Sequence, residues 1–240
     1  MQRIPSDFVA KMAHDLKTPV GNAMMYTELM SEDLKSMAEE HPDVKEELET
    51  LLQYCSNIHL SSSKLIYAIQ SWGYAFQIDD GVFQPRETTL DLKQMLTDVL
   101  ERNRLFTRIK RISVSLEYNA EATAFEADKE IMNLVFENLM SLFINMSPTG
   151  SEIRISVAEE DNGLMFRFEV PPAAFNPKLV ALYSDDIKLE NHMAPDQGIL
   201  KPGGYCLIFT NMALRYMESR HGVDEEGSES RSFWFHLPLS

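Results

Sequence analysis

The stretch Phe8-Val9-Ala10-Lys11-Met12-Ala13-His14-Asp15-Leu16-Lys17-Thr18-Pro19-Val20 places a histidine, a carboxylate, a cation and a hydroxyl within two helical turns. Its apolar residues recur at helical spacing, which predicts an amphipathic helix with His14 on the water-facing side and Thr18 one turn further along that face. Pro19 has no N–H to donate to the carbonyl of Asp15, so we expect the helix to kink or loosen there. An exposed histidine beside an acid suits reversible covalent chemistry.

The helical pattern extends outward from this stretch over residues 6–40 and breaks at Pro42. A second pattern then alternates three-residue and four-residue spacings, which is the seam of a coiled coil or helical bundle. The residues of this seam are Leu48, Leu51, Cys55, Ile58, Leu65, Ile69, Trp72 and Phe76. We therefore assign residues 1–80 to a helical hairpin. Because a lone hairpin buries only one seam, we expect two chains to form a four-helix bundle as a homodimer; the alternative is that the second domain covers the seam.

Residues 78–85 break the helix and predict a linker into a second domain, residues 85–240. The predicted elements of this domain are strands at 88–92, 112–116, 153–157, 164–170 and 232–237 and helices at 92–108, 129–144 and 205–220. Asp161-Asn162-Gly163 predicts a hairpin turn between two of these strands. The mixed order predicts an α+β protein whose second domain is an α/β sandwich, with helices on one face of a mostly antiparallel sheet.

The composition excludes several classes of protein. A formal net charge of −15 over 240 residues argues against a broad basic surface for nucleic acid or anionic lipid. No apolar run approaches the roughly 18 residues of a membrane span, so we expect a cytoplasmic protein or the corresponding part of a longer receptor. Cys55 and Cys206 lie far apart in apolar patterns, which predicts buried free thiols. The remaining histidines share no metal-ligand spacing, and no metal site is expected.

The order of these pieces resembles a bacterial two-component sensor histidine kinase over nearly the whole chain, and the opening stretch matches that family's H box at almost every position. The resemblance implies that His14 is the phosphoacceptor, Asp15 its acidic partner, and Thr18 the residue used when such proteins dephosphorylate a response regulator. The hairpin is similar to the dimerisation and histidine-phosphotransfer domain. Residues from about 85 onward resemble the catalytic ATP-binding domain, with 204–208 similar to its second glycine box.

The N box of that family is incomplete in this sequence. Its early asparagine is kept as Asn138, but Leu142 stands where the family has its magnesium-coordinating asparagine, and Asn145 stands where it has a phosphate-side lysine. Leucine offers magnesium no oxygen ligand. Glu137 and an acidic residue such as Asp185 or Asp186 are the candidates for an unusual replacement site.

Both glycine boxes also depart from the family. Residues 171–175 read Pro-Pro-Ala-Ala-Phe, with no aspartate for the adenine amino group and no glycine for the phosphates, and Pro172 and Phe175 are candidates to fill the cleft. The second box keeps Gly203 and Gly204 but has Cys206 at a second glycine position. Asn138, Gly203 and Gly204 are therefore weak nucleotide-binding candidates, and we expect a degenerate domain that holds no cofactor of its own and disfavours ATP.

These observations lead us to interpret the chain as a phosphotransfer protein. His14 would exchange a phosphoryl group with the aspartate of a response-regulator receiver domain, whose own acidic pocket brings the magnesium. In this interpretation the chain resembles the dimeric histidine phosphotransferases, and Thr18 also permits phosphatase activity on the regulator. Two alternatives stay open: an ATP-dependent sensor histidine kinase with an atypical nucleotide site, and a non-catalytic dimer scaffold that binds a regulator.

Overall fold

The computed structural model of the chain describes residues 6–121, 124–172, 204–224 and 231–238. The chain divides into two compact units, Met1–Tyr74 and Ala75–Ser240, which are described in turn. None of the helices in the described part of the chain combines the length and the hydropathy that a membrane span requires.

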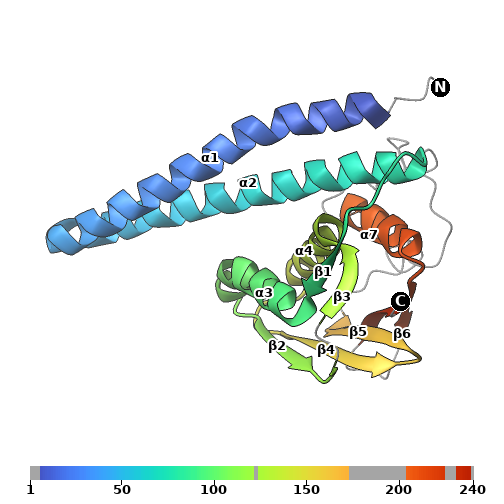
Figure 1. Ribbon diagram of the computed structural model, residues 1–240. Coiled ribbons are helices and arrows are strands. Elements are labelled where there is room, and N and C mark those ends of the chain that lie inside the picture. Colours follow the sequence, from blue (N-terminus) through green and yellow to red (C-terminus); the bar gives the residue numbers. More distant parts are fainter. Residues whose placement is uncertain (1–5, 122–123, 173–203, 225–230, 239–240) are drawn as a thin grey trace. The chain divides into compact units, whose positions relative to one another are not determined.

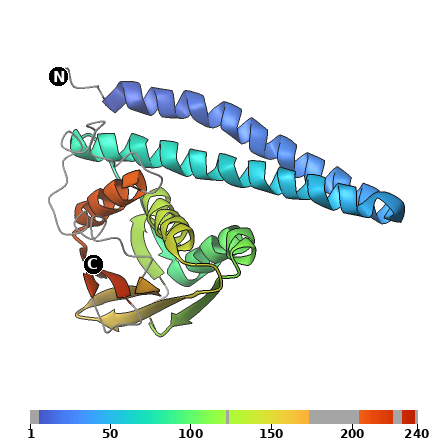
Figure 2. The ribbon, with the colours of Figure 1, turned by 180° about the vertical axis from the view of Figure 1, so that it is seen from behind.

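The first unit is the predicted helical hairpin. Helix α1 (Ser6–Glu40) is followed by a short 3₁₀ helix, η1 (Pro42–Val44), and by α2 (Lys45–Asp79). The two long helices run antiparallel and side by side (Figures 1 and 2). Helix α1 continues without interruption through Pro19, so the loss of one backbone donor does not end the helix.

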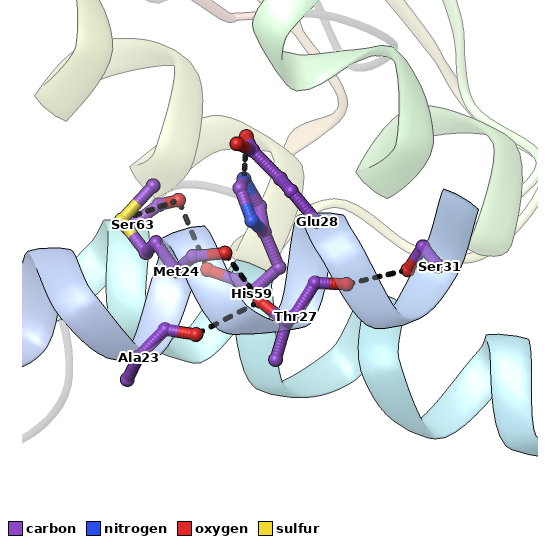
Figure 3. A network of polar contacts seen from close by, with 7 residues as sticks. All are labelled: Ala23, Met24, Thr27, Glu28, Ser31, His59 and Ser63. Atoms are coloured by element: carbon purple, nitrogen blue, oxygen red, sulfur yellow. Dashed lines mark hydrogen bonds and ion pairs between the residues drawn. The ribbon is translucent and has the colours of Figure 1, made fainter. Parts of the chain in front are cut away.

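Polar side chains hold part of the contact between α1 and α2. The Ser63 hydroxyl of α2 lies 3.8 Å from the Met24 sulfur of α1, and His59 Nε2 lies 3.8 Å from Glu28 Oε1 (Figure 3). Thr27 of α1 is buried, and its hydroxyl donates to the carbonyl of Met24 within the same helix at 2.8 Å. Satisfying this hydroxyl locally removes the penalty of burying an unpaired polar group in the hairpin.

Nearer the start of the chain the two helices meet through small residues. A Cβ built on Gly73 would lie 3.6 Å from the Cβ of Ala13, which is ordinary van der Waals contact. Gly73 of α2 therefore faces the turn of α1 that carries His14.

The second unit contains a five-stranded mixed sheet. Its strands are β2 (Ser113–Tyr118), β4 (Glu152–Glu160), β5 (Gly163–Val170), β7 (Arg231–Pro238) and β6 (Arg220–Asp224), in that spatial order. Only β2 and β4 pair in parallel; the other neighbours are antiparallel. Strands β1 (Glu87–Asp91) and β3 (Ala124–Asp128) form a separate antiparallel pair.

Helices α3 (Leu92–Ile109), α4 (Lys129–Met146) and α7 (Gly204–Tyr216) cover one face of this sheet (Figures 1 and 2). The core between the layers is aromatic: Phe136 and Phe143 of α4 pack on phenylalanines of β5 and β7. The rings of Phe166 and Phe235, paired across the two strands, stack with centroids 4.6 Å apart. Such packing of inward-facing alternate residues fixes the helices to the sheet.

The α+β class, the hairpin and the helix-covered, mostly antiparallel sheet are confirmed. Two strands were not predicted, β3 and β6, because their short polar sequences show little alternation and each is defined by its partner strand. The helix predicted to reach Arg220 ends at Tyr216, and Glu218 takes a left-handed backbone conformation that turns the chain into β6. Helix α2 runs through Asp79, into the predicted linker.

Candidate functional site

His14 projects into solvent from α1, as the helical spacing predicts. Its side chain is 82% exposed, and that of Asp15 is 65% exposed. The His14 Nδ1 atom lies 3.4 Å from the Asp15 Oδ1 atom. Thr18 is also exposed, one helical turn further along. The helix thus presents an imidazole, a carboxylate and a hydroxyl on one accessible surface.

The contact with Asp15 differentiates the two ring nitrogens of His14. A carboxylate is acceptor-only, so the Asp15 contact favours the tautomer that carries its proton on Nδ1. In that tautomer Nε2 holds the free lone pair, which is the one available to act as a nucleophile. A neutral imidazole in this state can attack phosphorus, and the nearby carboxylate stabilises the positive charge that develops on the ring.

The N-box positions lie on α4, which is held by its aromatic face against the sheet. Asn138 is buried on this helix, and Leu142 is only 5% exposed among apolar neighbours. Asn145 is exposed and its amide donates to the Ser141 hydroxyl at 3.3 Å. The buried side chain at position 142 therefore contributes packing to the core of the unit, and no oxygen to a metal ion.

Glu137 is engaged in a buried network between α3 and α4. Its carboxylate accepts a hydrogen bond from Arg102 Nε at 2.5 Å and another from Asn103 Nδ2 at 2.8 Å. Arg102 also reaches the Asn133 side chain at 3.3 Å. This carboxylate neutralises a guanidinium and joins two helices, which is a structural use of the residue that the sequence suggested as a replacement nucleotide ligand.

Several sequence candidates lie outside the described residues: Phe175, Asp185, Asp186 and Gly203, as well as the side chain of Cys206. Gly204 is the first residue of α7. Pro172 is half-buried at the end of the described segment. Cys55 is a buried free thiol, as predicted. Across the ranges that the structure describes, no three His, Cys, Asp or Glu side chains gather as a metal site.

Sequence reasoning missed the partners of Glu137. Arg102 and Asn103 lie about 35 positions earlier in a different helix, and nothing in their local pattern indicates a buried carboxylate. The one usable signal is composition: an asparagine at an apolar position of the otherwise amphipathic α3 requires a polar partner when it is buried.

Comparison with known proteins identifies the first unit. Residues 6–64 match the family described as the His Kinase A (phospho-acceptor) domain, and the match includes His14, Asp15 and Thr18. The sensor histidine kinase GacS of Pseudomonas protegens is 23% identical over 99% of this chain, which spans 25% of that relative. The sensor protein CopS of Pseudomonas syringae pv. tomato is 25% identical over 76% of this chain, with 34% of that relative covered.

Solved structures share the fold over most of the chain. Full-length ShkA, solved in complex with AMPPNP, superposes with a TM-score of 0.64 at 14% identity, covering 99% of this chain and 46% of that one. The Acinetobacter baumannii histidine kinase AdeS gives a TM-score of 0.55 at 14% identity over 89% of this chain and 95% of that chain. The chain thus spans about a quarter to a third of the curated relatives named above. By its phosphoacceptor match, its relatives and its fold, the chain is similar to two-component sensor histidine kinases.

Proposed function

We propose that this chain carries a phosphoryl group on His14 and exchanges it with the aspartyl phosphate of a response-regulator receiver domain. The single observation that carries this proposal is the exposed His14–Asp15 pair within the phosphoacceptor match. In the loading step, Nε2 of His14 forms a bond to phosphorus as the acyl phosphate P–O bond of the regulator breaks. The regulator's carboxylate leaves with the bonding electrons, the ring keeps its Nδ1 proton, and Asp15 stabilises the positive charge of the phosphorylated ring.

Magnesium and the phosphoryl donor come from the partner in this proposal. A receiver domain holds its own magnesium beside the phosphorylated aspartate, and the charge of the transferring group is stabilised there. This agrees with the buried leucine at position 142 and with the structural use of Glu137. In a separate reaction, Thr18 would orient a water molecule toward the regulator's aspartyl phosphate; the water's oxygen would form a bond to phosphorus as the acyl phosphate P–O bond breaks, releasing inorganic phosphate.

We further propose that two hairpins pair into a four-helix bundle, working in the cytoplasm, where the regulator resides. Large apolar side chains are exposed along both helices of the single chain, and a helix that exposes such residues needs a partner surface. These residues are Met12, Leu16, Met25, Tyr26, Leu29, Met30, Met37, Val44, Leu51, Tyr54, Ile58 and Leu65.

An ATP-dependent kinase is the second candidate function. Two observations favour it: the likeness to GacS, a protein named as a sensor histidine kinase, and the fold shared over 99% of this chain with full-length ShkA, which was solved in complex with AMPPNP. In that case ATP would load His14 directly, and the second unit would bind nucleotide through residues other than Leu142.

One labelling experiment separates these functions. The chain is incubated with ³²P-labelled MgATP alone, and in parallel with a panel of receiver domains phosphorylated by labelled acetyl phosphate. Label that reaches wild type only from a receiver, is lost in His14→Ala and is kept in His41→Ala supports the proposal; His41 is an exposed histidine at the helical turn. Label from MgATP without any receiver establishes the kinase instead. A His14→Ala protein that binds and acts on receivers like wild type establishes the scaffold.

A further inference from the structure

A cavity of about 150 Å³ lies within the second unit, where the segment after α2, strand β3 and the end of α7 meet. Its walls include the aromatic side chains of Phe83, Phe125 and Tyr216. The rings of Phe83 and Tyr216 pack edge to face with centroids 5.0 Å apart. A cavity of this volume holds a group about the size of benzene, which is one amino-acid side chain or one small organic molecule.

The charge in this cavity has one sign. Glu87, Glu126 and Asp128 line it, and no lysine, arginine or histidine is among the described residues of its lining. Glu87 and Asp128 are direct partners across the β1–β3 ladder, and Glu126 lies two positions from Asp128 on the same face of β3. Like charges directly opposite each other in a sheet are destabilising. A bound cation would relieve this repulsion.

Only part of this negative charge is used by the fold. Asp128 caps α4 by accepting from the backbone N–H groups of Glu130 and Ile131, and its other oxygen accepts from the N–H of Arg86 at 2.7 Å. Glu126 accepts from the Thr89 hydroxyl. The Glu87 side chain is exposed, and within the described ranges its carboxylate takes part in no hydrogen bond or ion pair; the residue pairs with Asp128 through the β1–β3 ladder. Its carboxylate is therefore available to a ligand.

We propose that this cavity binds an organic cation, an amine or guanidinium carried on a short apolar stem. The rings of Phe83 and Tyr216 accommodate the stem, and the carboxylates at the rim pair with the cationic head. The net charge of −15 on the chain favours the approach of a cation and disfavours an anion. A bare metal ion fits poorly, because these carboxylates do not gather as a metal-ligating group in the described part of the chain.

The ligand would join three segments that are distant in sequence. Phe83 follows α2, Phe125 belongs to β3 and Tyr216 ends α7. Binding to all three in the folded state but not in the unfolded chain stabilises the second unit by mass action. The site is independent of His14, so its occupancy and the phosphoryl chemistry can be measured separately.

The test is calorimetric titration of the full chain with three probes of matched length: n-pentylamine, 1-pentanol and pentanoate. We expect the amine to bind at least about tenfold more tightly than the alcohol, and pentanoate to show no binding, since the rim carboxylates favour a cation. Glu87→Gln should weaken amine binding about threefold to fivefold, and the Glu87→Gln, Glu126→Gln double variant about tenfold. Glu121→Gln, which removes an exposed carboxylate outside the cavity, should leave the affinity unchanged.

Two further measurements identify the source of the cation and check that the variant remains folded. Agmatine is compared with a capped Gly-Gly-Arg-Gly-Gly peptide: tighter binding of agmatine assigns the site to a free cation, and tighter binding of the peptide assigns it to an arginine side chain of a partner. The melting temperature of Glu87→Gln should not fall, because the change removes like-charge repulsion. Equal affinities for pentylamine and pentanol, or amine binding that survives the double variant unchanged, would overturn the proposal.

Discussion

The Glu137 carboxylate, almost fully buried on α4, accepts a hydrogen bond at 2.5 Å from the guanidinium of Arg102, whose side chain is 43% exposed on α3. The buried negative charge of Glu137 is thus neutralised by a guanidinium that is itself partly exposed to solvent. Removing the guanidinium leaves the carboxylate buried, with Asn103 as its one remaining hydrogen-bond donor among the described residues.

We therefore expect Arg102→Met to lower the free energy of unfolding by about 2–3 kcal/mol, below the full cost of an orphaned buried charge because Arg102 is partly solvated. Urea denaturation followed by circular dichroism measures this. The control is Arg104→Met on the same helix, because the Arg104 guanidinium pairs only with the exposed Glu101 among the described residues; its effect should stay under about 0.5 kcal/mol. Equal effects of the two changes would contradict a special role for the pair.

Lys110 closes the end of α4. Its Nζ donates to the carbonyls of Ile144 at 2.8 Å and Asn145 at 2.6 Å, two carbonyls in the last turn of the helix. Lys110→Met should cost about 1–2 kcal/mol of stability, because it removes both the hydrogen bonds and a cation at the negative end of the helix dipole.

Lys129→Met, at the other end of the same helix, is expected to change the stability in the opposite direction. Lys129 is exposed in the first turn of α4, where a cation is unfavourable, so its removal should leave stability unchanged or raise it by about 0.3 kcal/mol. Thermal melts at low and high salt check both variants, and the Lys129 effect should shrink as salt is added. If both Lys110→Met and Lys129→Met lowered the stability, the effect would come from the loss of a positive charge in general and not from capping of α4 by Lys110.

Gly163 has no room for a side chain. A Cβ at this position would lie 2.4 Å from both the His236 ring and the carbonyl oxygen of Leu237, a backbone atom that cannot swing away. Gly163→Ala should therefore destabilise the second unit by about 1–3 kcal/mol. Gly21→Ala is the matched change in an open helical position, with nothing within 4 Å, and should stabilise the hairpin by about 0.5–1 kcal/mol. Differential scanning calorimetry detects the two shifts.

Asp15→Asn keeps the size of the side chain and removes its charge. We expect phosphoryl loading of His14 from a receiver to slow about hundredfold, because the imidazolium that develops loses its carboxylate partner. Rapid-quench kinetics with a labelled receiver measure the rate. The melting temperature should be unaltered, since both side chains are largely exposed. An unchanged loading rate would remove Asp15 from the mechanism.

Thr18→Ala tests hydrolysis separately from transfer. If the Thr18 hydroxyl orients the attacking water, release of inorganic phosphate from a phosphorylated receiver should fall at least about tenfold, with loading of His14 unaffected. Thr18→Ser retains the hydroxyl and should restore most of the release. A parallel loss of both reactions would point to disturbed docking of the regulator.

The sequence predicts those parts of the fold whose pattern is strong and local. Residues 6–40 and 129–144 are periodic over several turns, and the hairpin at Asp161-Asn162-Gly163 has an explicit turn signal; all three are found. Strands β3 and β6 were not predicted, because they form through pairing with β1 and β7 and their own sequences carry little strand pattern. The contact of Arg102 with Glu137 likewise depends on how two helices pack. The exposure of His14 follows from helical spacing, whereas the roles of His14, Asp15 and Thr18 in phosphoryl transfer remain predictions.

Gly73 of α2 faces Ala13 of α1, the residue that precedes His14, and presents no side chain there. A globular protein that approaches His14 can therefore touch side chains of both helices within one footprint. Residues of α2, the helix that does not carry the reacting atom, would then contribute to the choice among regulators. Exchanging these residues would change which regulator is used without altering the chemistry at His14.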